Sequence, residues 1–122
     1  MKISIEKLNI YRKTAKIRIE KENKFLDERR KKAWDIALNA SYFLKAEYNA
    51  SQVMLFGSLI HNYWYSRYSD IDLAVWGIEG VKYFEAVAKL QDISFDFDID
   101  LVSVENCKAE LLKTILREGK KI

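Results

Sequence analysis

The chain contains no proline and only four glycines, of which Gly57 is the first. Proline and glycine are the residues that most often end helices, so nothing interrupts a helix in the first 56 positions. Residues 4 to about 48 are rich in Lys, Glu, Ala, Leu and Arg, which favour helix. The segment is therefore predicted to form either one very long helix or two consecutive helices with a break near Glu22–Leu26.

The two halves of this segment differ in their pattern of apolar and charged residues. From Ala33 onward, apolar side chains recur at intervals of three and four, as in a helix that packs on a core. Residues 1–34 instead carry 12 Lys and Arg against 5 Asp and Glu, a net charge of +7, whereas residues 35–122 have a net charge of −4. We expect residues 1–30 to form a basic helix that projects from the domain. Its face is either simply solvated or a docking surface for a partner, and direct nucleic-acid binding is not expected because aromatic residues do not interleave with the cations.

The rest of the chain alternates between strand and helix patterns. Strands are expected at 52–56, 69–76 and 94–104, and helices at 58 to about 65, 81–90 and 106–117. Asn106 is the expected N-cap of the last helix, and Gly119 its stop. The order of elements predicts one domain of the α/β or α+β class, with a small mixed sheet of three to four strands flanked by helices.

Composition narrows the kinds of site that the chain can build. Its 122 residues suit one domain. Cys107 and His61 are the single residues of their types, which excludes a disulfide framework and a His/Cys zinc site. A metal would therefore have oxygen ligands, which suits Mg²⁺ or Mn²⁺. The sequence has no apolar run long enough to span a membrane and no secretory leader pattern at its N-terminus, so we expect a cytoplasmic protein.

A pair of acids on one predicted strand is the main candidate for chemistry. Asp70 and Asp72 are separated by one residue, so their side chains project from the same face and repel each other unless a cation binds. A later strand carries Asp96, Asp98 and Asp100, again on one face, and any of these could supply a third carboxylate. Three carboxylates suffice for a site with two Mg²⁺ ions, because the remaining ligands are water and substrate phosphates.

The motifs around these acids resemble those of the nucleotidyltransferase superfamily to which DNA polymerase beta belongs. The matching segments are LFGS, ending at Ser58, SDIDLAVWG, containing Asp70 and Asp72, and IDLV, containing Asp100. The resemblance covers about residues 30–119 and is strongest to the minimal nucleotidyltransferases, the MntA-type antitoxins paired with HEPN toxins. It favours Asp100 as the third acid and implies a polymerase-beta-like catalytic core over 31–119.

The same resemblance implies a function and a role for each residue. Asp70, Asp72 and Asp100 would be the catalytic metal ligands for Mg²⁺, or Mn²⁺, with Asp100 also a candidate general base. Gly57 and Ser58 would bind the phosphates of ATP. The family's small basic loop is replaced here by a bulky one in which Arg67 is the nearest cation. The expected reaction transfers AMP, or another NMP, to a hydroxyl, with a tyrosine of a partner HEPN ribonuclease toxin as the acceptor.

Two other functions remain open at the level of sequence. The chain could be a non-catalytic module that inhibits its partner by occlusion, although the full set of acids argues against it. It could also modify a small molecule, in the manner of antibiotic nucleotidyltransferases, but it has no second domain with which to build the pocket. Association with a toxin, or with a second copy in a homodimer, would supply the additional surface that such a small domain lacks.

Overall fold

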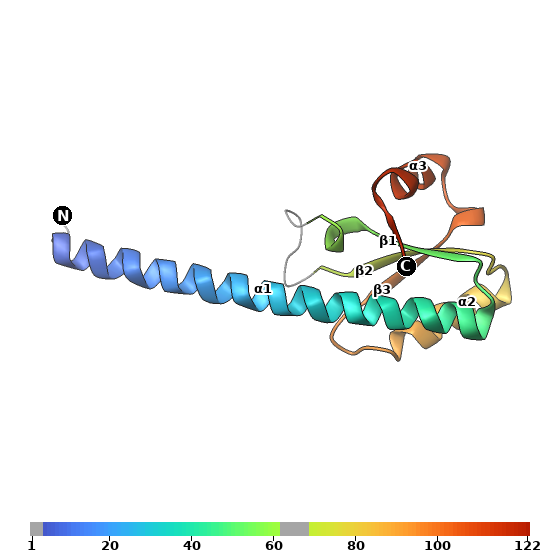
Figure 1. The fold of residues 1–122 in the computed structure, drawn as a ribbon, viewed down its shortest axis with the longest axis horizontal. Coiled ribbons are helices and arrows are strands. Elements are labelled where there is room, and N and C mark those ends of the chain that lie inside the picture. The colour runs from blue at the N-terminus through green and yellow to red at the C-terminus, as the bar shows by residue number, and fades with distance from the viewer. Residues whose placement is uncertain (1–3, 62–68) are drawn as a thin grey trace.

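The N-terminal segment forms a single helix in the computed structural model of the chain, which describes residues 4–61 and 69–122. Helix α1 (Ile5–Tyr48) runs for 44 residues without a break, so the prediction of one long helix is the correct alternative. It begins at Ser4, whose side chain accepts a hydrogen bond from the Lys7 backbone, and ends at Asn49 in the left-handed conformation, with φ of 55°. Its first half extends well beyond the rest of the molecule (Figure 1).

The strands form one mixed sheet with the order β3-β2-β1-β4. The strands are β1 (Gln52–Phe56), β2 (Ile71–Trp76), β3 (Ile99–Ser103) and β4 (Lys120–Lys121). Strand β1 is antiparallel to both β2 and β4, whereas β2 and β3 are parallel. This confirms the predicted fold class, and the short C-terminal β4 is a strand that the sequence pattern did not reveal.

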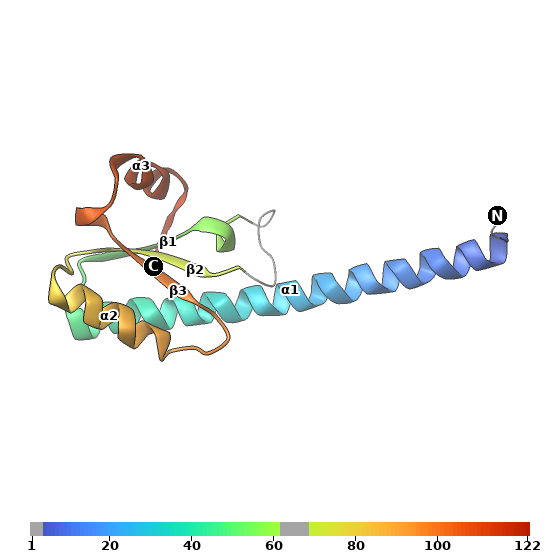
Figure 2. The ribbon, with the colours of Figure 1, turned by 180° about the vertical axis from the view of Figure 1, so that it is seen from behind.

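Helices cover the two faces of the sheet unequally. The second half of α1 and helix α2 (Val81–Gln91) lie on one face, and helix α3 (Ala109–Glu118) lies on the other (Figures 1 and 2). The face under α1 and α2 holds the main core, which includes the fully buried Leu44 and Leu55. A smaller core between the sheet and α3 contains Met54 and Ile115. Among the described elements, α3 alone covers this second face, and it covers only part of it (Figure 1).

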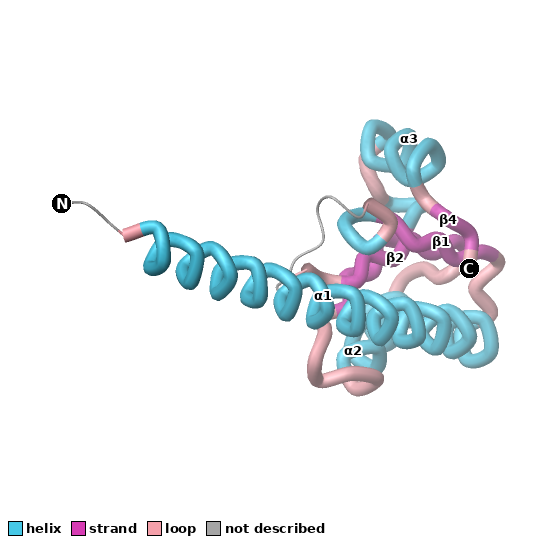
Figure 3. The backbone as a smooth tube through the Cα atoms, turned by 60° about the vertical axis from the view of Figure 1, so that its left-hand side comes forward, coloured by secondary structure: helices cyan, strands magenta, loops and turns pink. Residues whose placement is uncertain are grey.

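The first half of α1 extends away from the other described helices and strands over most of its length, as the tube in Figure 3 shows. The first α1 side chain that packs against the main core is Leu26, and complete burial starts at Ala33. Despite this length, no helix in the described ranges is apolar enough to cross a membrane.

Before the last helix, three predicted elements are shorter in the structure than the sequence pattern suggested. The strand expected at 69–76 begins only at Ile71, so Asp70 lies just before it. The strand expected at 94–104 begins only at Ile99, because residues 94–98 form a loop in which Asp96 pairs with Lys32 of α1. The helix expected from Ser58 is only a 3₁₀ turn, Gly57–Leu59, followed by a turn at Ile60. Residues 62–65, where we expected that helix to continue, lie outside the described residues.

The last helix also departs from its predicted ends. Asn106 belongs to a 3₁₀ turn, Val104–Asn106, and donates a hydrogen bond to the Ser103 hydroxyl, while the N-cap position falls on Lys108. Gly119 follows the helix as predicted, but its backbone is extended rather than left-handed. A side chain there would lie 2.5 Å from the Ile115 carbonyl oxygen, so close packing rather than backbone conformation requires glycine.

Truncation of a core leucine in α1 tests this packing. Leu44→Ala should lower the free energy of unfolding by about 2–5 kcal/mol, because Leu44 is fully buried and its removal leaves a cavity. The matched control is Leu38→Ala on the same helix, where the leucine is 48% exposed and the cost should stay below about 1 kcal/mol. Urea denaturation followed by circular dichroism measures both, and equal losses would contradict the packing of α1 on the sheet.

Candidate active site

Two of the predicted acids are neighbours across the parallel pair of strands. The register of β2 and β3 places Asp72 beside Asp100, so both side chains lie on the same face of the sheet. Asp70, two residues before Asp72, directly precedes β2. On this same face, α3 packs toward the other ends of the strands, against Ala74 and Val102. The structure therefore brings the three predicted acids together at the part of the sheet that α3 leaves uncovered.

Burial and mutual repulsion disfavour negative charge on these carboxyls. Burial raises the pKa of Asp72 to about 6, with further contributions from the charges of Asp100 and Asp70. The pKa of Asp70 is also raised, first by burial and then by the charges of Asp100 and Asp98. Negative charge on Asp70 and on Asp72 is thus unfavourable, and a bound cation would relieve that cost.

The structure separates the three candidates for the third acid. The Asp96 carboxylate accepts a hydrogen bond from Lys32, with Nζ 2.8 Å from Oδ2, and lies in the loop before β3. That hydrogen bond and the charge of Lys32, with help from Arg29, lower the pKa of Asp96. Asp98 directly precedes β3, and its charge contributes to the raised pKa of Asp70. Asp100 lies on β3, and its charge contributes to the raised pKa of both Asp70 and Asp72. Asp100 is accordingly the position best placed to be the third carboxylate, and its catalytic role stays a prediction.

The Gly57-Ser58 turn lies against the same acids. Phe56 of β1 pairs with Asp72, so the chain passes directly beside this carboxylate as it leaves the strand. Gly57 has φ of 79°, and a side chain at this position would collide with the Asp72 carboxylate. Only glycine satisfies both constraints, since it tolerates positive φ and adds no Cβ. Ser58 follows in the same turn, and Arg67, the third predicted phosphate ligand, lies outside the described residues.

Two arginines of α1 hold the loops on either side of the acids, a role that sequence reasoning missed. Arg30 donates from Nε and Nη2 to the Leu59 carbonyl oxygen, at 3.3 and 3.2 Å, and so fixes the Gly57–Leu59 turn. Arg29 donates from Nη2 to the Asp96 carbonyl oxygen at 2.7 Å and stacks over the Phe97 ring, 4.0 Å from its centroid. The only signal in the sequence is a pair of basic residues one turn before the apolar stripe begins.

His61 contacts a glutamate of α3. Its Nε2 lies 3.3 Å from Oε2 of Glu118, at the end of α3. Hydrogen bonds from Arg117 and then His61 lower the pKa of Glu118. His61 therefore links the segment after the Gly-Ser turn to α3, and its assignment as a polar loop residue rather than a base stays a prediction.

The donor set fits a divalent cation that prefers oxygen. Carboxylates converge at the end of the sheet, where burial and then the charges of neighbouring carboxylates raise the pKa values of Asp70 and Asp72. Within residues 4–61 and 69–122, no three Asp, Glu, His or Cys side chains are arranged to enclose an ion on their own. Mg²⁺ does not require such a cage, since it keeps waters and takes ligands from substrate phosphates.

Comparison with known proteins identifies the family of this fold and site. Residues 39–122 match the family model described as polymerase beta, nucleotidyltransferase. The chain belongs to this family, which confirms the superfamily predicted from the Gly-Ser and Asp-x-Asp motifs. No curated protein sequence is significantly similar to the chain.

Similar solved structures come from toxin–antitoxin pairs. A crystal structure of a toxin–antitoxin with AMP-PNP matches with a TM-score of 0.57 and 27% identity, over 68% of this chain and 69% of that one. Two mutant forms of the MntA–HpeT toxin–antitoxin match with TM-scores of 0.54 and 0.53, at 24% and 25% identity. The matches cover 65% and 66% of this chain and 64% of each of theirs, so the chain spans just under two thirds of their length. These likenesses agree with the predicted subgroup.

The raised pKa of Asp72 predicts that Asp72→Asn stabilises the protein near neutral pH when divalent ions are absent. The folded protein holds this proton more tightly than the unfolded chain, so the stabilising contribution is complete below the unfolded pKa and is lost as pH rises through about 6. At about pH 7.5, removal of the charge should raise the free energy of unfolding by roughly 1–2 kcal/mol after solvent screening. At about pH 4.5 the difference should shrink below roughly 1 kcal/mol.

Urea denaturation at the two pH values measures this difference. Asp35→Asn is the matched control, because Asp35 is exposed on α1 and its loss should change stability little at either pH. If Asp72→Asn is less stable than the wild-type protein at about pH 7.5, the negative charge of Asp72 does not destabilise the folded protein and the prediction is wrong.

The Arg30 contact predicts a defect confined to the Gly-Ser turn. Arg30→Met removes both donors to the Leu59 carbonyl oxygen, which should cost about 1–2 kcal/mol of stability and weaken ATP binding severalfold. The neighbouring exposed Lys31→Met should do neither. Equilibrium titration with ATP gives the affinities, and Arg30→Lys should recover part of the loss. Unchanged ATP affinity in Arg30→Met would separate this arginine from the nucleotide site.

Proposed function

We propose that the protein is a Mg²⁺-dependent nucleotidyltransferase that moves AMP, or another NMP, from a nucleoside triphosphate to a hydroxyl of a partner protein. The observation that carries this proposal is the Asp72–Asp100 pair, adjacent across β2 and β3, with Gly57 against Asp72. The family assignment supports nucleotidyl transfer as the reaction class. In this proposal the partner is a HEPN toxin, the acceptor is one of its tyrosines, and the protein acts as the antitoxin in the cytoplasm.

The residues divide the work of the reaction. The acceptor oxygen attacks the α-phosphorus, an O–P bond forms, the bond from that phosphorus to the bridging oxygen breaks, and pyrophosphate leaves. Divalent ions bound to Asp70, Asp72 and Asp100 would neutralise the triphosphate and favour loss of the hydroxyl proton. Asp100, which is exposed at the end of the sheet, accepts that proton or passes it to water. Gly57 lets the backbone approach a phosphate closely, and the Ser58 hydroxyl donates to it.

The similar structures support the choice of nucleotide and partner. One relative is described as a toxin–antitoxin with AMP-PNP, an analogue of ATP, which favours ATP as the donor here. That relative and the mutant MntA–HpeT pairs are assemblies of a toxin with its antitoxin, which favours a toxin as the partner. The tyrosine acceptor rests on the resemblance of the sequence motifs to the subgroup paired with HEPN toxins.

Label transfer from ATP tests the reaction and the choice of acids together. With Mg²⁺ and the cognate HEPN protein, ATP labelled at the α-phosphate should label the partner. Asp72→Asn and Asp100→Asn should each lower the rate by at least about a hundredfold, because each removes a metal ligand. The matched control is Asp96→Asn, since Asp96 is paired with Lys32 and should keep the rate within about threefold. Mass spectrometry of the partner then locates the added nucleotide.

Two outcomes of this experiment would favour the other functions. Silencing of the toxin without any label on it, unchanged in Asp72→Asn, would indicate inhibition by occlusion. Label on small hydroxyl compounds but not on the protein would indicate the antibiotic-type reaction.

The same assay tests the choice of the third acid. Loss of activity in Asp98→Asn but not in Asp100→Asn would identify Asp98, rather than Asp100, as the third carboxylate.

A further inference from the structure

An apolar stripe on the projecting half of α1 continues the stripe that packs on the core. Ala33, Ala37, Ala40 and Leu44 are completely buried against the domain. Counting back from Ala33 by helical intervals of three and four leads to Leu26 and then to a set of residues beyond the domain. We call this set the distal stripe, and its members are Leu8, Tyr11, Ala15 and Ile19.

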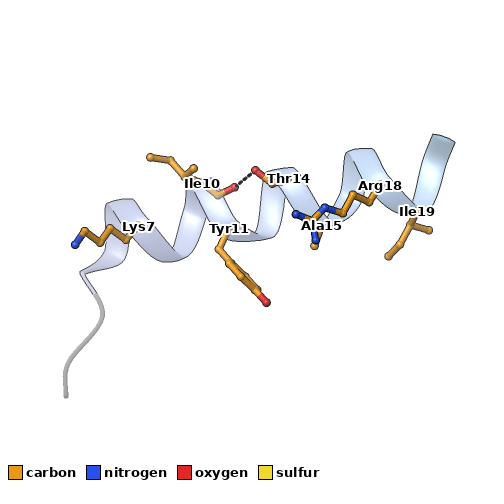
Figure 4. Close-up of a pocket in the computed structure, with 7 residues that line it drawn as sticks. All are labelled: Lys7, Ile10, Tyr11, Thr14, Ala15, Arg18 and Ile19. Atoms are coloured by element: carbon orange, nitrogen blue, oxygen red, sulfur yellow. Dashed lines mark hydrogen bonds between the residues drawn. The ribbon is translucent and has the colours of Figure 1, made fainter. Parts of the chain in front are cut away.

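Two side chains of the distal stripe, Tyr11 and Ile19, are exposed, and the other two, Leu8 and Ala15, are partly exposed. Tyr11 is 74% exposed and Ile19 is 61% exposed. In Figure 4, Tyr11 and Ile19 extend from the same side of the helix, while Ile10 points from the opposite side. A depression runs beside the stripe, and within residues 4–61 and 69–122 the side chains that line it come from α1. The stripe is thus an open face of one helix, of the kind that another helix can cover.

Basic side chains border the distal stripe on both edges. With 3.6 residues per turn, Lys7 and Arg18 fall along one edge, and Arg12 and Lys16 fall along the other. No acidic residue lies between Glu6 and Glu20, so this stretch has cations alone. Side chains that flank an apolar helical seam decide which partner can pair with it, because like charges across the seam repel.

We propose that the distal stripe is the docking surface for an acidic amphipathic helix of a partner protein. Such a helix would cover the apolar side chains with its own and place carboxylates opposite Lys7, Arg12, Lys16 and Arg18. A second copy of this chain is disfavoured as the occupant, since parallel and antiparallel pairing would both oppose cations to cations. The surface lies far from Asp72 along α1, so the proposal does not depend on the proposed transfer reaction.

The distribution of the apolar residues separates this proposal from binding to a lipid surface or to nucleic acid. Ile10 and Ile17 lie on the side of the helix opposite the stripe. A helix that lies in a membrane interface gathers its large apolar residues on one broad face, which this helix does not do. Nucleic-acid backbones are bound by cations that face the phosphates, whereas here the centre of the basic region is apolar.

A designed peptide and two charge-reversal variants of the full chain test the proposal. The probe is a fluorescent three-heptad helix with Leu at its seam and Glu at the flanking positions, and the control peptide has Lys in place of Glu. We expect the Glu peptide to bind and the Lys peptide not to bind, as measured by fluorescence anisotropy. Arg12→Glu/Lys16→Glu should weaken binding of the Glu peptide by at least about tenfold.

The matched control has the same change of charge on the opposite side of the helix. Lys13→Glu/Lys21→Glu should weaken binding less than about threefold, because both positions face away from the stripe. Circular dichroism checks that both variants keep their helix, and Asp72→Asn should bind the peptide like the wild-type chain. Loss of transfer in that variant with intact peptide binding would separate the two proposals.

Four results would overturn the docking proposal. The first is failure of the Glu peptide to bind, and the second is equal weakening by both charge-reversal variants, which would show a general charge effect. The third is a stable dimer of the free chain in sedimentation, and the fourth is tighter binding to single-stranded RNA or to vesicles containing phosphatidylserine than to the Glu peptide.

Discussion

Repulsion between the carboxylates of Asp72 and Asp100 is the interaction on which the site depends. The parallel register of β2 and β3 fixes the two side chains next to each other, and partial burial of Asp72 makes the charge more costly. The sheet tolerates this arrangement because its other face is the main core, where Ile71 and Leu73 are completely buried. Hydrophobic burial on one face thus offsets the unfavourable electrostatic free energy of the carboxylates on the other. A bound cation would remove this unfavourable term, and the same free energy would favour its binding.

Helix α1 fixes the loops at the end of the sheet that carries the acids. Small side chains at Ala33 and Ala37 let the helix approach the sheet closely, and both are completely buried. One turn earlier, Arg29 and Arg30 hold the two loops that border the acids, one through the Asp96 carbonyl and one through the Leu59 carbonyl. The geometry of the site therefore depends on a helix that contributes none of its acids.

Features of the fold and the site that depend on residues close together in the sequence could be predicted, whereas those that depend on distant residues could not. Alternation and spacing are local, so they correctly gave the sheet class and a helical N-terminal segment, but they did not decide between one helix and two, and they placed Asp70 on a strand that begins only at Ile71. Alternation failed at residues 94–98, because the contacts of Lys32 and Arg29 with this loop connect segments more than sixty positions apart. The same limit hid β4, a two-residue strand defined only by its pairing with β1. For the third acid, alternation left Asp96, Asp98 and Asp100 as candidates and the family resemblance favoured Asp100. The pairing of Asp72 with Asp100 in the structure supports that choice.

The positions of the cations bear on how the site could neutralise a triphosphate. The basic residues of the described chain that border the acids are already engaged, since Arg30 donates to Leu59, Arg29 donates to Asp96, and Lys32 pairs with the Asp96 carboxylate. A nucleotide that approaches Gly57 would meet the negative charges of Asp70 and Asp72 before any of these side chains. Binding of a polyanion beside clustered carboxylates requires counter-charge, which divalent ions held by Asp70, Asp72 and Asp100 would supply. The excess of basic residues in α1 lies toward its other end, where charge selects a macromolecular partner rather than a phosphate.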